Sequence, residues 1–94
     1  MTTRETFDKH NSEYIKFDLV QKKLSSRPDV HAFLLLDSMF PGTSDIIDGA
    51  SHDEIYLSVP VDDLLMRATE DQVVELIRCG VRYDSFTDSL AIFV

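Results

Sequence analysis

Apolar residues in the first part of the chain recur at helical spacing. Thr2 and Glu5 form a capping-box pattern, in which a hydroxyl and a glutamate three places on satisfy free backbone N–H groups, so a helix should begin here. The stripe that follows consists of Phe7, Tyr14, Phe17 and Leu24, widened by Ile15, Leu19 and Val20. Because this spacing repeats along one helix face, we predict one long helix through residue 25 with its aromatic face toward the core.

Residues 30–40 are mostly apolar, and their period alone does not separate a buried strand from a buried helix. Pro28 suits a first helical turn, Asp29 suits the positive end of the helix dipole, and Pro41 with Gly42 suits a helix end. The segment is long and has few β-branched residues, so a helix is favoured. Joined to the first helix by a short turn, it would complete an N-terminal helical hairpin.

Short strand and helix patterns follow in alternation. Residues 46–47 and 54–59 have strand patterns around a polar connection at residues 48–51, which is the arrangement of a β-hairpin. Residues 61–68, directly after Pro60, are typical of a short helix.

The last third of the chain carries the clearest local signals. Thr69 and Gln72 form a second capping box, which opens a helix that Gly80 closes. Residues 81–84 and 89–94 are apolar runs around a polar tip, as in an antiparallel hairpin. The sequence therefore predicts one α+β domain over residues 1–94, with an N-terminal helical hairpin, a small antiparallel sheet of about three or four strands packed against helices, and a C-terminal β-hairpin.

Charge is unevenly distributed along the 94 residues, whose formal net charge is −8. Residues 1–36 hold six Lys and Arg against five acids, a net of +1, whereas residues 37–94 hold three Arg against twelve acids, a net of −9. Nucleic-acid binding needs clustered basic residues, so we expect no direct contact with nucleic acid. A basic protein surface or a divalent cation would be attracted instead.

The composition also indicates in which cellular compartment the protein is found. The longest apolar run, Ala32–Leu36, is too short to span a membrane, and the first ten residues have no apolar signal region. A single cysteine, Cys79, excludes a disulfide framework. We therefore expect a cytoplasmic protein with no membrane partner.

Residues 51–60, with the sequence Ser-His-Asp-Glu-Ile-Tyr-Leu-Ser-Val-Pro, locally resemble the His-Asp-Glu turn and following strand in the palm of family A DNA polymerases. In that family the Asp holds a catalytic metal, so the resemblance implies this role for Asp53. A polymerase also needs a second metal-binding Asp, a nucleotide-binding helix, and a chain long enough for palm, fingers and thumb. We therefore reject the resemblance as a guide to function.

Other catalytic or metal chemistry finds little support in the sequence. The acids Asp45, Asp48, Asp53 and Glu54 are clustered as hard cations prefer, but their spacing around Gly49 matches no calcium loop. Cys79 falls at the end of a predicted helix, where the dipole disfavours a thiolate. The three histidines, His10, His31 and His52, lie in separate segments without a nearby nucleophile. We expect no enzyme activity, no cofactor and no resident metal.

The remaining feature is the acidic surface. We predict a small non-enzymatic protein-binding module that meets a basic surface of a nucleic-acid-handling protein, as an accessory or inhibitory factor. It resembles small acidic proteins that imitate the phosphates of DNA, many of them phage-encoded inhibitors, in size and charge. The acids that we select for partner binding are Asp48, Asp53, Glu54, Asp62, Asp63, Glu70 and Asp71.

Two alternatives remain. One is a homodimeric interaction protein that uses an aromatic helix face, because the chain holds more large aromatic and sulfur-bearing residues than a small core obviously needs, namely Phe7, Tyr14, Phe17, Met39, Phe40 and Phe86. The other is a carboxylate metal-dependent enzyme centred on His52 and Asp53, which would require a pocket that gathers these side chains with another carboxylate.

Overall fold

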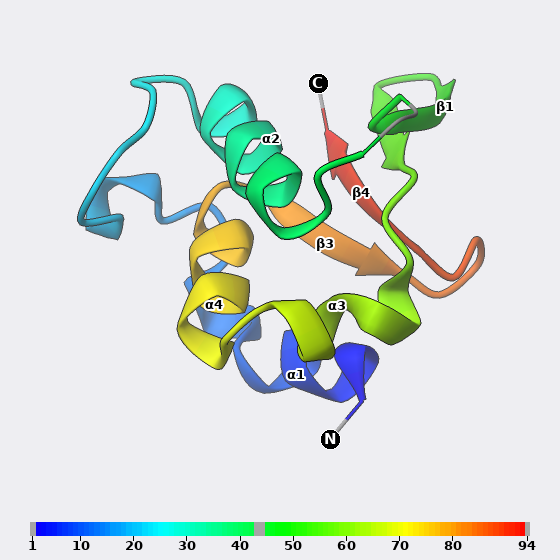
Figure 1. The fold of residues 1–94 in the computed structure, drawn as a ribbon, viewed down its shortest axis with the longest axis horizontal. Coiled ribbons are helices and arrows are strands. Elements are labelled where there is room, and N and C mark those ends of the chain that lie inside the picture. The colour runs from blue at the N-terminus through cyan, green and yellow to red at the C-terminus, as the bar shows by residue number, and fades with distance from the viewer. Residues whose placement is uncertain (1, 43–44, 94) are drawn as a thin grey trace.

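Four α-helices and four β-strands make up most of the described chain, which comprises residues 2–42 and 45–93 of this computed structural model (Figure 1). The α-helices are α1 (Thr3–Lys9), α2 (Pro28–Met39), α3 (Val61–Arg67) and α4 (Glu70–Arg78). The strands are β1 (Ile47–Ser51), β2 (Glu54–Leu57), β3 (Val81–Asp84) and β4 (Ser89–Phe93). Two short 3₁₀ helices, η1 (Asn11–Glu13) and η2 (Phe17–Leu19), lie between α1 and α2.

The strands form one antiparallel sheet in the order β1-β2-β4-β3. Leu57 of β2 and Tyr83 of β3 both pair with Leu90 of β4, so these three residues share one face of the sheet. That face packs on the helices. The α+β architecture, the helix-covered sheet and the C-terminal hairpin of β3 and β4 are confirmed.

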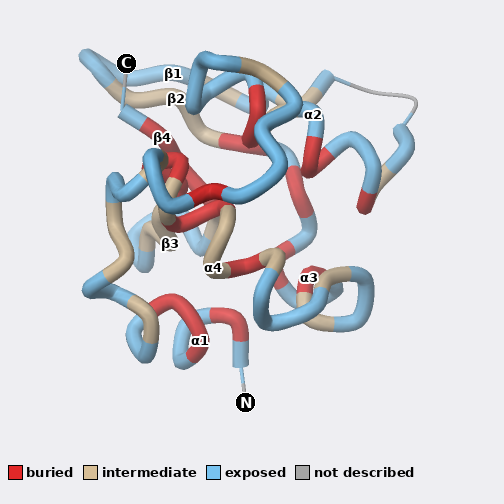
Figure 2. Tube along the Cα trace, turned by 90° about the vertical axis from the view of Figure 1, so that its left-hand side faces the viewer, coloured by how far each residue is buried: buried red, intermediate tan, exposed pale blue. Residues whose placement is uncertain are grey.

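The core draws on every layer of the fold. Leu36 of α2, Leu57 of β2, Leu64 of α3, Leu76 of α4 and Leu90 of β4 are each almost completely inaccessible to solvent. Figure 2 shows the buried stretches of the helices and strands turned toward one another across this core. Since no disulfide is present and Cys79 is free, this packing carries the stability.

Local signals place the later elements correctly. Thr69 accepts a hydrogen bond from the backbone N–H of Gln72, and the Gln72 side chain accepts one from that of Thr69, so the second capping box is present as predicted. Gly80 follows α4 with φ of +100°, a left-handed conformation that glycine adopts without steric cost. The choice of a helix over a strand for residues 30–40 is confirmed, because they belong to α2 except for Phe40, which caps it.

The prediction of one helix through residue 25 is wrong. The capping box of Thr2 and Glu5 forms as expected, but α1 ends at Lys9. A straight helix over residues 3–25 would be about 34 Å long at about 1.5 Å per residue, longer than the 28 × 28 × 27 Å extents of the molecule. Residues 10–27 instead cross α4 as an irregular segment with η1 and η2, so the first two α-helices are not joined by a short turn.

The polar connection predicted at residues 48–51 is also wrong, because these residues belong to β1. The turn falls at His52 and Asp53, and Ala50 pairs with Ile55 across it. Pairing at a sheet edge uses the backbone, so the strand forms without a row of apolar side chains.

Within the described ranges, no helix has the length and apolar composition needed to cross a membrane.

Candidate functional site

The seven acids selected from the sequence lie on two parts of the fold, the β1–β2 hairpin and the helices α3 and α4. On the hairpin, Asp53 lies in the turn and Glu54 begins β2, whereas Asp48 lies near the start of β1, opposite the last residues of β2. The chain then runs along β2 to α3 and α4, which carry the other four, Asp62, Asp63, Glu70 and Asp71. Figure 1 shows β1 and α3 well apart. The two groups are therefore separate surfaces.

Two of these acids form ion pairs with other residues of the fold. Glu54 pairs with Arg82 on the outer face of the sheet. Glu70 lies 3.5 Å from Lys9 and 3.3 Å from His10, both near the end of α1. In the part of the chain that the structure describes, the other five are exposed and form no ion pair.

The three arginines of residues 37–94 are all engaged internally. The Arg67 guanidinium lies 5.1 Å from the centre of the Phe40 ring, Arg78 bonds to Glu13 at 3.1 Å, and Arg82 pairs with Glu54. The arginines of residues 37–94 therefore interact within the fold, and the exposed aspartates give this part of the surface a negative charge.

The negative charge at the start of α3 reaches the β3–β4 hairpin. Tyr83 donates a hydrogen bond to Asp88, and this bond raises the pKa of the Tyr83 hydroxyl. Burial and the negative charges of Asp88 and Asp62 raise this pKa further, whereas the positive charge of Arg4 lowers it. We call the first turn of α3 and the turn between β3 and β4, with the residues Asp62, Asp63, Asp84, Phe86 and Asp88, the acidic end.

Internal hydrogen bonds order the turn at this acidic end. Asp84 accepts a hydrogen bond from the backbone N–H of Phe86 at 3.2 Å and another from the Thr87 hydroxyl at 2.9 Å. The Thr87 and Ser89 hydroxyls lie 2.6 Å apart. Asp88 has a φ of +51°, which aspartate tolerates better than most residues. The turn is thus a built structure that holds Phe86 outward.

Phe86 is 99% exposed, unlike the other members of the aromatic and sulfur-bearing set. Phe7 and Met39 are buried, and Tyr14, Phe17 and Phe40 pack against the core. The signal for Phe86 was in the sequence, because a large aromatic side chain within the polar tip of a predicted hairpin has no core to enter.

The residues considered for catalysis are not assembled into a reactive group. His52 and Asp53 are exposed in the β1–β2 turn, and among the described residues no three His, Cys, Asp or Glu side chains gather closely enough to hold a metal ion. Cys79 is buried, and this burial, with the nearby Glu75 charge, raises the pKa of its thiol to about 12. A thiol with this pKa is almost entirely protonated near neutral pH, so it is a poor nucleophile.

His31 is a satisfied core histidine. Its Nδ1 accepts a hydrogen bond from the backbone N–H of Leu24 at 3.0 Å, so the ring proton is on Nε2, which donates to Glu75 at 3.0 Å. The Phe17 ring meets the imidazole edge-on at 5.8 Å between centroids. This histidine ties the irregular segment to α2 and α4.

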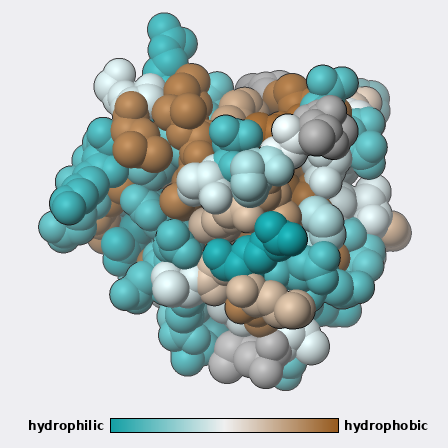
Figure 3. All heavy atoms as spheres, in the orientation of Figure 1, coloured by the Kyte–Doolittle hydropathy of each residue, from teal (hydrophilic) through white to brown (hydrophobic). Residues whose placement is uncertain are grey.

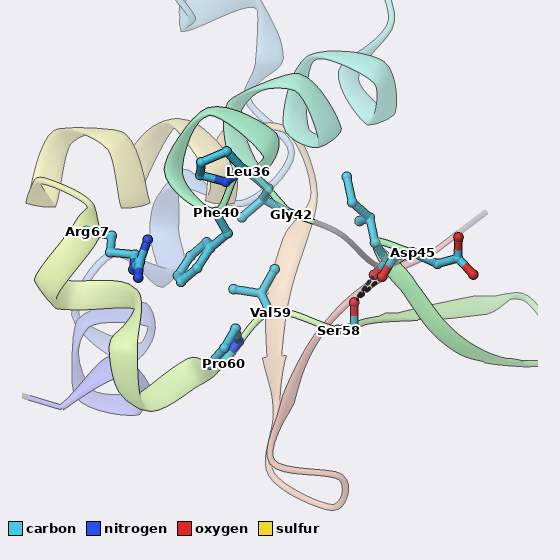
Figure 4. A pocket seen from close by; sticks show the side chains of 10 residues that line it. Leu36, Phe40, Gly42, Asp45, Ser58, Val59, Pro60 and Arg67 are labelled. Atoms are coloured by element: carbon cyan, nitrogen blue, oxygen red, sulfur yellow. Dashed lines mark hydrogen bonds between the residues drawn. The ribbon is translucent and has the colours of Figure 1, made fainter.

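A pocket of about 260 Å³ opens between the end of α2, the link from β2 to α3, and Arg67 (Figure 4). Its polar groups are engaged within the fold. Ser58 donates to the backbone carbonyls of Asp45 and Ile46, and Arg67 reaches the carbonyl of Met39 at 3.4 Å. The Asp45 carboxylate points away from the cavity in Figure 4. Among the described residues, the polar side chains that line this pocket bond to the backbone or point away from the cavity, so none is placed to recognise a ligand.

Comparison of the chain with protein-family models, curated proteins and solved structures finds no match. Function is therefore inferred from the geometry of this chain.

Proposed function

We propose that the protein is a small, non-enzymatic protein-binding module, cytoplasmic as its single free cysteine favours, whose acidic end meets a basic surface of another protein. The observation that supports this most directly is Phe86, 99% exposed on an ordered hairpin tip between the acids Asp84 and Asp88. Aromatic anchors set within polar surroundings supply much of the binding energy at protein interfaces.

The energetics favour Phe86 as an anchor. Burying a phenylalanine side chain in a partner's pocket contributes about 1.5 to 3 kcal/mol. The bonds from Asp84 already order the turn, so little conformational freedom remains to be lost on binding.

The surrounding charge favours a basic partner. Asp62 and Asp63 occupy the first turn of α3, and both are exposed. Such acids accelerate association with a positively charged surface and select against an acidic one. Nucleic-acid-handling proteins have basic grooves of this kind, so an accessory or inhibitory role toward one of them is the form of the proposal that we favour.

The alternatives gain no specific support. Phe7 is buried, and Tyr14 and Phe17 pack on the core, so these side chains are committed to the fold rather than presented for a homodimer. His52 and Asp53 lie on an exposed turn and line none of the pockets described here.

The test is an affinity capture from cell lysate with four versions of the protein at about 0.05 M and about 0.5 M salt. They are the wild type, Phe86→Ala, the double variant Asp62→Asn with Asp63→Asn, and a control, Asp48→Asn with Asp53→Asn, that alters the distant acidic group. Each variant is first checked for an unchanged unfolding midpoint.

The proposal expects one protein that the wild type and the control capture at low salt, and that both acidic-end variants lose. Less of this protein should be captured at high salt, because salt screens the attraction between the exposed Asp62 and Asp63 and a basic partner. A protein retained by both acidic-end variants, a loss seen only in the control, or no captured protein at either salt would overturn the proposal.

A further inference from the structure

A second pocket, of about 430 Å³, lies at the end of the β3–β4 hairpin that is opposite to its turn. Four separate stretches of chain bound it, namely residues 14–17, 28–29, 78–80 and 92–93. Its lining is mostly apolar, and two of the large side chains in it, Ile15 and Phe93, are 66% and 51% exposed. An apolar cavity of about 150 Å³ already binds benzene, so this pocket has room for a phenyl ring.

Basic residues predominate beside this pocket. Residues 16–29, which supply part of its lining, hold four Lys and Arg against two Asp, a net of +2. All six are exposed, and none forms an ion pair with any described residue; they are Lys16, Asp18, Lys22, Lys23, Arg27 and Asp29. Lys23 lies 5.2 Å from the centre of the Phe17 ring, which lines the pocket. Arg78 also lines it, but its charge is balanced by Glu13 at 3.1 Å.

The turn between β3 and β4 has the complementary properties. Phe86 is 99% exposed there, with Asp84 and Asp88 on either side of it and no basic residue in the turn. Asp84 accepts hydrogen bonds from the Phe86 N–H and the Thr87 hydroxyl, so the turn is ordered before any contact forms. A phenyl ring on an ordered, negatively charged tip matches an apolar pocket beside basic residues.

The tip and the pocket cannot meet within one chain, because the length of β3 and β4 separates them. Asp84 pairs with Ser89 at the tip end, whereas Val81 pairs with Ile92 at the pocket end. Figure 1 shows the end of β4 near the C-terminus and the turn at the other end of that strand. The pocket of one copy can therefore receive only the tip of another molecule.

We propose that Phe86 of one copy inserts into this pocket of a second copy, with the acids of the tip facing the basic residues of the irregular segment. The two contacting surfaces differ, so the association is head-to-tail and leaves a free tip and a free pocket at the ends of each dimer. A contact built on one aromatic anchor buries little area, so it is weak and transient. It does not rest on the proposed function, but it uses the same tip and would compete with the basic partner.

The first test measures the weight-average mass of the wild type by sedimentation equilibrium, from about 0.05 mM to about 1 mM protein. The mass should rise with concentration, and it should rise less at about 0.5 M salt than at about 0.05 M salt. Phe86→Ala should weaken association by about tenfold or more, since the phenyl ring is lost. Met66→Ala is the control, because Met66 is also apolar and 83% exposed, and it should change nothing.

Two variants alter the pocket side. Ile15→Asp places a carboxylate at the pocket and should abolish association by repelling the tip; aspartate also tolerates the φ of +55° at this position. Leu34→Asp makes the same change of charge at an exposed residue of α2 that does not line the pocket, and should have no effect. Lys16→Glu should weaken association by about twofold to fivefold. Denaturant titration first checks that each variant is folded.

A mixture of variants tests the head-to-tail arrangement. Phe86→Ala keeps its pocket and Ile15→Asp keeps its tip, so neither should associate alone, but together they should form a 1:1 dimer that does not grow further. NMR with one partner isotope-labelled locates the contact. Amide shifts should change in the four pocket stretches when Phe86→Ala is labelled, and at residues 84–89 when Ile15→Asp is labelled.

Three results would overturn the proposal: a mass that does not depend on concentration, association of Phe86→Ala equal to that of the wild type, or no dimer in the mixture. Capture from lysate with dilute protein separates it from the proposed function, because Ile15→Asp should still capture the basic partner. Self-association without any captured protein would reject the proposed function alone, whereas capture without self-association would reject this inference alone.

Discussion

Residues 10–27 and the unit formed by α3 and α4 are of similar length, but they are stabilised in different ways. The helix α4 has a complete capping box, a glycine at its end, and a buried stripe of Val73, Leu76 and Ile77. Residues 10–27 have only two short 3₁₀ helices of their own. The helical unit thus carries much of its order in its local sequence, and the irregular segment does not.

Bonds to other elements hold the irregular segment in place. The Ile15 N–H donates to the Ile77 carbonyl at 3.2 Å, Glu13 pairs with Arg78 at 3.1 Å, and the Leu24 N–H donates to His31. Its exposed apolar residues include Ile15 and Leu24, which are therefore not held by burial in the core. Figure 3 shows a separate feature, a group of hydrophobic side chains over the region of α2. A segment held by a few distant contacts should open before the helices beneath it.

The largest expected effect comes from His31→Ala. The side chain is 1% exposed, and its loss leaves a cavity, removes the acceptor for the Leu24 N–H and leaves Glu75 without its donor. Denaturant titration should show that the free energy of unfolding is lower than that of the wild type by about 2 to 3 kcal/mol. Hydrogen exchange should show that the amides of residues 20–27 lose protection first.

The control for this change is His52→Asn. His52 is exposed and has a φ of +53°, a conformation that asparagine also accepts, so stability should be unchanged. If the amides of α4 and of residues 20–27 lost protection equally in His31→Ala, the irregular segment would not be a separately opening unit.

A smaller effect is expected from removing the cap of α4 with Thr69→Ala. The Thr69 hydroxyl accepts from the Gln72 N–H, and without it that donor loses its partner. Unfolding should require about 1 kcal/mol less free energy, measured by denaturant titration. Ser26→Ala removes an exposed hydroxyl from the irregular segment and should change nothing. Equal effects of the two changes would show that capping does not distinguish the regions.

The sequence predicted those elements whose signals are local. The caps at Thr2 and Thr69, the glycine after α4, and the polar tip between β3 and β4 each specify structure within a few residues. A helix was correctly chosen over a strand for residues 30–40 on the same kind of signal.

The rest depended on tertiary structure. An apolar period continues through Tyr14 and Phe17, but these side chains reach the core from a segment that crosses α4. No local pattern shows that a helix through this stretch would exceed the size of the molecule. Similarly, the backbone pairing that makes β1 a strand leaves no mark on its polar side chains.

The candidate sites divide in the same way. The sequence identifies the acidic residues, but only the fold shows that Glu54 and Glu70 form ion pairs while Asp62 and Asp63 are exposed. The pocket lined by Tyr14, Asp29 and Ile92 joins four separate stretches of chain, so no sequence motif could identify it.

The smallest expected effect has the opposite sign and concerns Ile15. This residue is 66% exposed and has a φ of +55°, a left-handed conformation that is unfavourable for a β-branched side chain. Asparagine tolerates this conformation, and little burial would be lost, so Ile15→Asn should raise the free energy of unfolding by about 0.5 kcal/mol. Leu19→Asn is the control, because Leu19 is also an exposed apolar residue but has a negative φ, and it should give no gain. Destabilisation by Ile15→Asn in a denaturant titration would show that the side chain's contacts outweigh its backbone strain, and the irregular segment would then be more tightly packed than its few bonds indicate.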